Sequence, residues 1–298
     1  MAQPPERAAV TNAAVPPLPA RWRALPYRAF LRARARTRAV WPGSAADAWR
    51  GVRILSYHAV NDDPCDLLAT PARRLGQHFD TVRAAGIEII PMRDVYRRLE
   101  THPDGQAVAV VFDDGYRDML INALPVLEAH GVPATVFVCD EIVSGTARCT
   151  WYRFPPPFMD WDELRKLTAS GLVDVQPHGS RHMDLPHLDH ESASREILGC
   201  VERLAAEGFA PHTYCYAGGF HGPRERSIVA GCAQLAGAVS TAPGVNGREA
   251  DRASLRRTMI VGNERPAEFR AILAGACDAP SWVARTRRAL RRPQPARD

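Results

Sequence analysis

The chain has 298 residues, of which 46% are hydrophobic and 24% charged, and its formal net charge is +5 at pH 7. This length and composition suit one globular domain with a sizeable core. No stretch approaches the roughly 18 consecutive apolar residues of a membrane span, and residues 1–19 lack the charged start and apolar core of a secretory signal. The seven cysteines form no C-x-x-C pair. Their odd number predicts reduced thiols rather than a disulfide framework, so we expect a cytoplasmic protein.

The positive charge is concentrated near the two ends of the chain. Between Arg21 and Arg38 there are seven arginines and no acidic residue, and Trp22 and Trp41 accompany them. One interpretation is a basic amphipathic arm, residues 21–41, that contacts an anionic membrane peripherally. The other is a solvated or disordered extension that packs on the domain through its aromatic residues. No recognised nucleic-acid-binding module accompanies the charge, so we expect no nucleic-acid partner.

Between these ends, strand-like and helix-like stretches alternate. Strands are predicted at residues 52–60, 87–91, 108–112, 133–139, 172–176, 212–217 and 237–241. Helices are predicted over residues 79–85 before Gly86, after a cap at Asp94, and over 124–130, 161–170, 191–207 and about 224–235. Repeated βα units imply a parallel sheet with right-handed crossovers, and their number approaches a closed but irregular (β/α) barrel. The predicted organisation is a basic arm at 1–50, one folded domain at 51–280 and a basic mobile tail at 281–298.

Two segments place reactive side chains directly after predicted strands. The apolar run at residues 108–112 leads into Asp113, Asp114 and a glycine, and the segment HGSRH after residues 172–176 contains His178 and His182. Alone, Asp-Asp-Gly is typical of a turn, and two histidines four residues apart are typical of a solvated surface. Together they indicate a site, because barrel enzymes keep their active residues at strand ends. One carboxylate and two imidazoles are the three protein ligands of a metal that keeps an open position.

These segments resemble the motifs of the polysaccharide deacetylases with the NodB-homology domain, carbohydrate esterase family four. In that family the motifs read roughly TFDDG and H-[ST]-x-x-H, and here they read VFDDG and HGSRH. The segments ILSYHAV, TYCYAGGF and LRRTMI are similar to further family segments, so the resemblance covers about residues 52–269. The first of these is most similar to the branch that deacetylates poly-N-acetylglucosamine. The resemblance implies a single catalytic domain with a NodB-type irregular (β/α) barrel.

The resemblance also implies an activity. It predicts a metal-dependent hydrolase that removes an N-acetyl group from an amino sugar, in an oligosaccharide, a polysaccharide or a lipid-linked glycan. Asp114, His178 and His182 would hold a divalent metal, with zinc favoured and cobalt or nickel as substitutes. Asp113 would be the general base. His58 would be the acid that protonates the leaving amine or a substrate contact, with a structural core histidine as the alternative.

The expected substrate-binding residues are Tyr116, Tyr216, Gly219 and Arg257. By resemblance Arg257 would also orient Asp113 through an ion pair, although the adjacent Arg256 is a second candidate for this role.

Two departures from the family pattern affect the expected substrate rather than the chemistry. Ala217 stands where relatives have proline, and Gly179 replaces the hydroxyl residue that usually follows the first histidine. Two other functions therefore stay open: a deformylase or other carbon–nitrogen amide hydrolase of the same superfamily, and a non-catalytic carbohydrate-binding relative. The presence of both acids and both histidines argues against the second.

Overall fold

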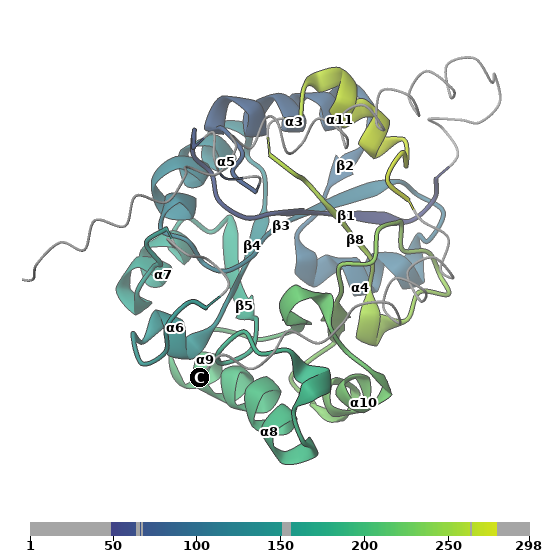
Figure 1. The fold of residues 1–298 in the computed structure, drawn as a ribbon. Coiled ribbons are helices and arrows are strands. Elements are labelled where there is room, and N and C mark those ends of the chain that lie inside the picture. Colours follow the sequence, from purple (N-terminus) through teal and green to yellow (C-terminus); the bar gives the residue numbers. More distant parts are fainter. Residues whose placement is uncertain (1–48, 64–65, 67, 151–155, 263, 279–298) are drawn as a thin grey trace, which may run out of the picture.

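Parallel strands form the centre of the molecule (Figure 1). The computed structural model describes residues 49–278, apart from residues 64–65, 67, 151–155 and 263. Within this part of the chain the strands are β1 (Val52–Tyr57), β2 (Glu88–Ile89), β3 (Ala107–Phe112), β4 (Ala134–Val138), β5 (Val173–Pro177), β6 (Thr213–Cys215), β7 (Gly237–Val239) and β8 (Arg257–Met259).

The strands close into an irregular barrel. Five of them pair in the order β5-β4-β3-β1-β8, and β2 pairs with the start of β3. A second pair, β6-β7, joins this sheet on both sides: Val239 bridges to Leu255 just before β8, and the side chain of Gln176 on β5 accepts a hydrogen bond from the backbone N–H of Thr213 on β6. The prediction of an irregular (β/α) barrel is therefore confirmed.

Helices surround the strands, as Figure 1 shows. The helices are α3 (Ala72–Ala84), α4 (Met92–Thr101), α5 (Leu124–His130), α6 (Asp140–Val143), α7 (Trp161–Thr168), α8 (His190–Ser194), α9 (Cys200–Ala206), α10 (Pro223–Gly231) and α11 (Pro266–Leu273). Two π-helical turns, η1 (Met119–Ala123) and η3 (Arg195–Gly199), are continuous with α5 and with α8 and α9.

The apolar core has two main parts because β1, β3 and β4 are buried on both faces. On one face, residues such as Leu55, Val110 and Val136 pack against the surrounding helices. On the other, Ile54 and Val111 fill the barrel interior together with side chains of α4. A strand that is buried on both faces reads as a continuous apolar run, which is why residues 108–112 were recognisable in the sequence.

Most predicted elements are confirmed, with local corrections. Helix α5 ends where predicted, at a left-handed Gly131, and a capping box between Asp160 and Glu163 begins α7. Asp94 is not a cap: α4 begins at Met92 after Pro91, which leaves Asp94 in the first turn. The strand predicted at residues 87–91 has only two residues, because β4 takes over the pairing along β3.

Three of the helices predicted near the site also differ from expectation in their extent. The helix predicted over residues 191–207 contains the π-helical turn η3, α10 ends at Gly231, and α7 ends at Thr168.

The ends of the chain lie almost entirely outside the described residues, and so does the arm at 21–41. Among the described residues the cysteines are free, and Cys139, Cys200 and Cys215 are buried. No described helix combines the length and the apolar character that crossing a bilayer requires.

Candidate active site

The two sequence motifs meet at the carboxyl ends of β3 and β5. These strands flank β4 in one parallel sheet, so the loops that follow them emerge at the same rim. The backbone N–H of His178 bonds to the carbonyl of Val138, the last residue of β4, at 2.9 Å. Gly115 permits a close approach on the other side, because a Cβ at this position would lie 2.8 Å from a methyl carbon of Val138. The predicted acids and histidines therefore share one end of the barrel.

Asp114, His178 and His182 form a cluster with the dimensions of a metal site. The Oδ1 atom of Asp114 lies 3.5 Å from Nε2 of His178 and 3.7 Å from Nε2 of His182. Tetrahedral zinc, with ligand bonds of about 2.0–2.1 Å, separates its ligand atoms by roughly 3.3–3.4 Å. This Oδ1 is buried and has no hydrogen-bond partner among the described residues. An orphaned carboxylate oxygen between two imidazole nitrogens fits a divalent cation.

The backbone of this cluster is strained. Asp114 has φ 74° and His182 has φ 61°, and these are the non-glycine residues with positive φ in the described part of the chain. A left-handed conformation costs a non-glycine residue about 1–2 kcal/mol. Such strain tends to gather at functional sites, where the surrounding structure maintains it. Both strained residues are predicted metal ligands.

Neighbouring groups orient two of the three side chains. Nδ1 of His178 lies 2.8 Å from the carbonyl oxygen of Cys215, so this nitrogen carries the proton and Nε2 presents its lone pair to the cluster. The hydroxyl of Tyr116 donates to Oδ2 of Asp114 at 2.8 Å. Second contacts of this kind fix the orientation of metal-binding side chains.

The pKa values fit a cation-binding cluster for two of the three groups. Burial alone would raise the pKa of Asp114, but the contacts with His178 and His182 outweigh it and keep the carboxyl ionised. Burial lowers the pKa of His182 to about 4, so its ring is neutral near pH 7. The pKa of His178 is raised instead, because its contacts with Cys215 and Asp114 outweigh burial, so cation binding must release a proton there.

Asp113 has a different set of partners. Its Oδ1 forms an ion pair with Nη1 of Arg257 at 2.6 Å, and its Oδ2 lies 3.8 Å from Nε2 of His58. Burial would raise the pKa of Asp113, but the charge of Arg257, followed by those of His58 and His178, holds it below its ordinary value. The adjacent Arg256 bonds instead to the carbonyl of Pro243. The predicted contact between Arg257 and Asp113 therefore exists in the structure.

His58 lies where an acid or a substrate contact would be expected. It directly follows β1, and its side chain is 12% exposed. Its Nδ1 atom is buried and has no hydrogen-bond partner among the described residues. A core histidine normally satisfies both ring nitrogens, so this arrangement favours the functional interpretation over the structural one.

The other predicted substrate contacts are packed inside the protein. Tyr116 is only 1% exposed and Tyr216 is fully buried. The Tyr216 hydroxyl donates to the carbonyl of Ala253, and its ring stacks on His221 at 4.2 Å. A Cβ on Gly219 would collide with Thr241 at 2.0 Å, so this glycine permits a close loop contact. Tyr116 and Tyr216 therefore offer little side-chain surface to a substrate.

The sequence did not reveal several groups that contact the cluster. The Cys215 thiol lies 3.9 Å from Oδ1 of Asp113, and the Ser56 hydroxyl lies 3.4 Å from Oδ2. Glu196 accepts hydrogen bonds from the backbone of the HGSRH loop and is 5% exposed. A signal for Glu196 existed, because a charged residue stands between Ala193 and Cys200 on the apolar face of its helix.

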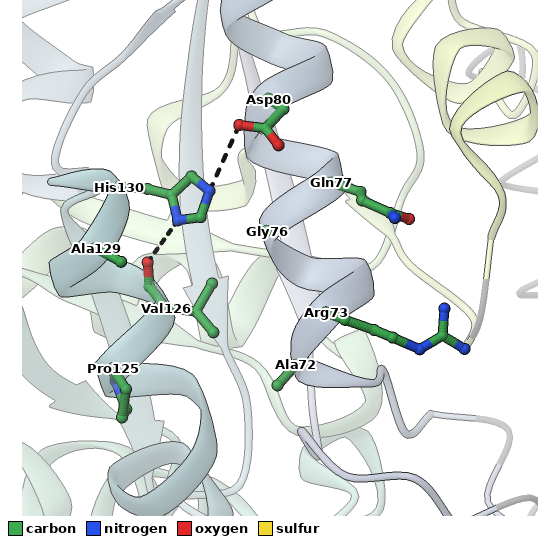
Figure 2. Close-up of a pocket in the computed structure, with 9 residues that line it drawn as sticks. All are labelled: Ala72, Arg73, Gly76, Gln77, Asp80, Pro125, Val126, Ala129 and His130. Carbon is green, nitrogen blue, oxygen red and sulfur yellow. Dashed lines mark hydrogen bonds and ion pairs between the residues drawn. The ribbon is translucent and has the colours of Figure 1, made fainter.

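A separate hollow of about 350 Å³ lies between α3 and α5 (Figure 2). His130 in this hollow is not placed as a metal ligand. Its Nδ1 is hydrogen-bonded to the carbonyl of Val126 at 2.9 Å, and its Nε2 lies 3.5 Å from Asp80. None of the clustered acids and histidines lines this hollow. The candidate active site is therefore the barrel rim rather than this surface.

Comparison with known proteins finds a family match for the central part of the chain. Residues 100–233 match the family model described as polysaccharide deacetylase. The Bacillus subtilis (strain 168) protein named "Putative polysaccharide deacetylase YxkH" is 23% identical over 146 residues. This match spans 48% of the chain and 48% of the relative, so it covers about half the length of the relative.

Solved structures share the fold. The Streptococcus pyogenes deacetylase PplD in complex with acetate superposes with a TM-score of 0.63 at 20% identity, covering 74% of this chain and 96% of the other. IcaB from Ammonifex degensii gives a TM-score of 0.62 at 22% identity, covering 76% and 97%.

Residues 100–233 therefore match the polysaccharide deacetylase family, and the predicted resemblance is confirmed over this part of the chain. This is a family of hydrolases that act on carbon–nitrogen bonds of N-acetylated carbohydrates.

Proposed function

We propose that this protein is a metal-dependent hydrolase that removes an N-acetyl group from an amino sugar within an oligosaccharide, a polysaccharide or a lipid-linked glycan. The family supports the hydrolase class and a carbohydrate substrate. The metal, the roles of individual residues and the sugar are our proposal.

One observation carries this proposal. The adjacent acids Asp113 and Asp114 belong to different sets of contacts. Asp114 faces two imidazoles across distances of 3.5 and 3.7 Å, whereas Asp113 is paired with Arg257 at 2.6 Å. One carboxylate can therefore bind a cation while its neighbour remains available for proton transfer. A protein that only bound carbohydrate would have no chemical need for this division.

When bound, a divalent ion in the Asp114, His178 and His182 cluster polarises an amide carbonyl and makes water a better nucleophile at neutral pH. Zinc suits the mixed nitrogen and oxygen donors, and cobalt or nickel are substitutes. Asp113, ionised and oriented by Arg257, accepts the proton of the attacking water. His58, whose Nε2 lies 3.8 Å from Oδ2 of Asp113, delivers a proton to the leaving amine nitrogen.

The test combines activity with metal content. Purified protein is offered a panel of N-acetylated and N-formylated sugars, with and without a chelator, and released acetate and formate are measured. We expect acetate release, loss of activity with chelator and recovery with added zinc, with about one zinc per chain. Formate release without acetate release would favour the deformylase alternative.

Variants separate the two acids. Asp113→Asn should retain zinc but lose about 10²–10⁴-fold in turnover, because a general base is missing. Asp114→Asn and His182→Ala should lose zinc and activity together. His187→Ala is the matched control, since the side chain of His187 is 52% exposed outside the cluster. Zinc lost from Asp113→Asn and kept by Asp114→Asn would contradict the assignment.

We also propose a cytoplasmic protein that contacts an anionic membrane through residues 21–41. The free cysteines of the described residues support the compartment, and the seven arginines between Arg21 and Arg38 support the contact. Removing residues 1–43 should abolish salt-sensitive sedimentation with anionic vesicles and leave hydrolysis of a soluble sugar nearly unchanged. Full-length protein that does not bind anionic vesicles at low salt would contradict the membrane contact.

A further inference from the structure

A buried carboxylate is hydrogen-bonded to the backbone of the loop that carries both histidines, residues 178–183, called the histidine loop below. Glu196 lies in the π-helical turn η3 and is 5% exposed. Its Oε1 atom accepts hydrogen bonds from the backbone N–H groups of Arg181 at 2.8 Å and Met183 at 3.1 Å. These two residues flank His182, so one oxygen atom is fixed to the backbone on both sides of a proposed metal ligand.

The conformation of the loop explains why an anion suits this position. His182 has φ 61°, and a turn that contains a left-handed residue directs nearby N–H groups toward one point. The Glu196 carboxylate occupies that point. In addition, the backbone carbonyl of Glu196 accepts a hydrogen bond from the N–H of Ser180 at 3.1 Å. Glu196 therefore contacts three N–H groups between the two histidines and just after them.

Gly179 and Glu196 are complementary in shape. Gly179 has φ 87°, and a Cβ at this position would lie 2.8 Å from Oε1 of Glu196 and 3.1 Å from the hydroxyl oxygen of Tyr214. The carboxylate thus takes the space into which a side chain at position 179 would project. The family pattern has a hydroxyl residue at position 179, where this chain has glycine. The carboxylate of Glu196, from the helical turn η3, lies against this glycine.

Glu196 is buried, and its carboxylate is hydrogen-bonded to backbone N–H groups. In the described part of the chain, its carboxylate accepts hydrogen bonds from the backbone N–H groups of Arg181 and Met183. Burying a carboxylate without an ion pair is costly unless hydrogen bonds compensate for the lost hydration. The compensation that the structure provides comes from the backbone of the histidine loop.

We propose that Glu196 is a positioning residue that sets the orientation of His182 toward the metal through the N–H groups of Arg181 and Met183. In this chain it takes the place of a hydroxyl residue at position 179. The proposal rests on the proposed metal cluster of Asp114, His178 and His182, and it adds a residue from outside the two sequence motifs.

The experiment measures zinc affinity by chelator competition for the full-length protein and three variants of Glu196. Glu196→Ala should bind zinc about 10–100-fold more weakly, the usual effect of losing a partner that orients a ligand. Glu196→Gln should bind within about threefold of wild type, because its amide oxygen accepts the same N–H groups. Glu196→Asp keeps the charge but is one methylene shorter, and it should resemble Glu196→Ala. Glu202→Ala is the matched control, since Glu202 is exposed on α9.

A second readout separates orientation from folding. The visible spectrum of the cobalt-substituted protein reports ligand geometry, and it should change in Glu196→Ala and Glu196→Asp but not in Glu196→Gln. Thermal unfolding in chelator shows whether each variant is folded. If Glu196→Ala does not fold, the comparison of Glu196→Gln with Glu196→Asp decides the question.

The outcomes distinguish this inference from the proposed function. Suppose that wild type binds zinc and that Glu196→Ala binds it with equal affinity and shows an unchanged cobalt spectrum. That result would overturn this inference but not the proposed function. Affinity retained by Glu196→Asp and lost in Glu196→Gln would also overturn it, because charge rather than reach would then matter. Wild type that binds no zinc would overturn both.

Discussion

Replacing Arg257 by methionine should destabilise the fold by several kcal/mol, because Asp113 would keep a buried charge without its partner. The two side chains are 2% and 5% exposed, and Nη1 lies 2.6 Å from Oδ1. Nε of Arg257 also donates to the carbonyl of Ser240 at 2.9 Å. The pair thus links the end of β3 to β8 across the barrel interior.

The structure sets the scale of the effect. At an effective dielectric constant of about 20, two unit charges 2.6 Å apart attract by about 6 kcal/mol. Desolvation of both ions offsets much of this, but removing one partner of a buried pair typically costs about 3–5 kcal/mol. Arg257→Met and Asp113→Asn should each lose that amount. The double variant should lose clearly less than the sum, which gives a coupling energy of about 3 kcal/mol.

The assay is urea unfolding of the four proteins, followed by circular dichroism in the presence of chelator. The chelator matters because bound metal would stabilise the variants to different extents. Arg226 and Asp251 form a matched control pair, at 2.7 Å but with side chains 42% and 47% exposed, and their coupling should be below about 1 kcal/mol. A coupling between Arg257 and Asp113 that is no larger than in this control would refute the reasoning.

Three further outcomes are expected. Burial lowers the pKa of His78 from 6.5 to about 4, so the unfolded chain takes up a proton first as the pH falls. The free energy of unfolding relative to His78→Gln should therefore be highest above about pH 6.5. It should decline by about 3 kcal/mol between pH 6.5 and pH 4 and change little below pH 4. Urea unfolding at each pH measures this dependence. Asp160→Ala removes the capping box with Glu163 and should lower the free energy of unfolding by about 1 kcal/mol, whereas no loss would show that the cap is dispensable. Tyr116→Phe removes the hydrogen bond to Asp114 and should weaken zinc binding about tenfold by chelator competition; unchanged affinity would contradict that role.

Local signals in the sequence determined the alternation of strands and helices and the position of both motifs. The run at residues 108–112 is apolar throughout because both faces of β3 are covered, and Gly131 ends α5 because it adopts the left-handed conformation without penalty. One error arose from a competing local signal. Asp94 looked like a cap, yet Pro91 precedes the helix.

The sequence also predicted which acids and histidines gather, because the ends of parallel strands meet at one rim. It could not separate Arg256 from Arg257. Neighbouring residues on a strand face opposite sides, and the pairing of β8 with β1, with Arg257 beside Ile54, decides which of them enters the barrel.

The contacts that orient the site depend largely on the tertiary structure. The carbonyl of Cys215 that orients His178 belongs to the backbone, which every residue type provides, so no side chain announces it. Glu196 reaches the loop from a helix whose register changes at a π-helical turn, a feature without a local sequence signature. The sequence determined which acids and histidines are candidates for the site, because residue type and strand ends are local properties. The fold alone decided how those groups are oriented, because orientation depends on contacts between segments far apart in the chain.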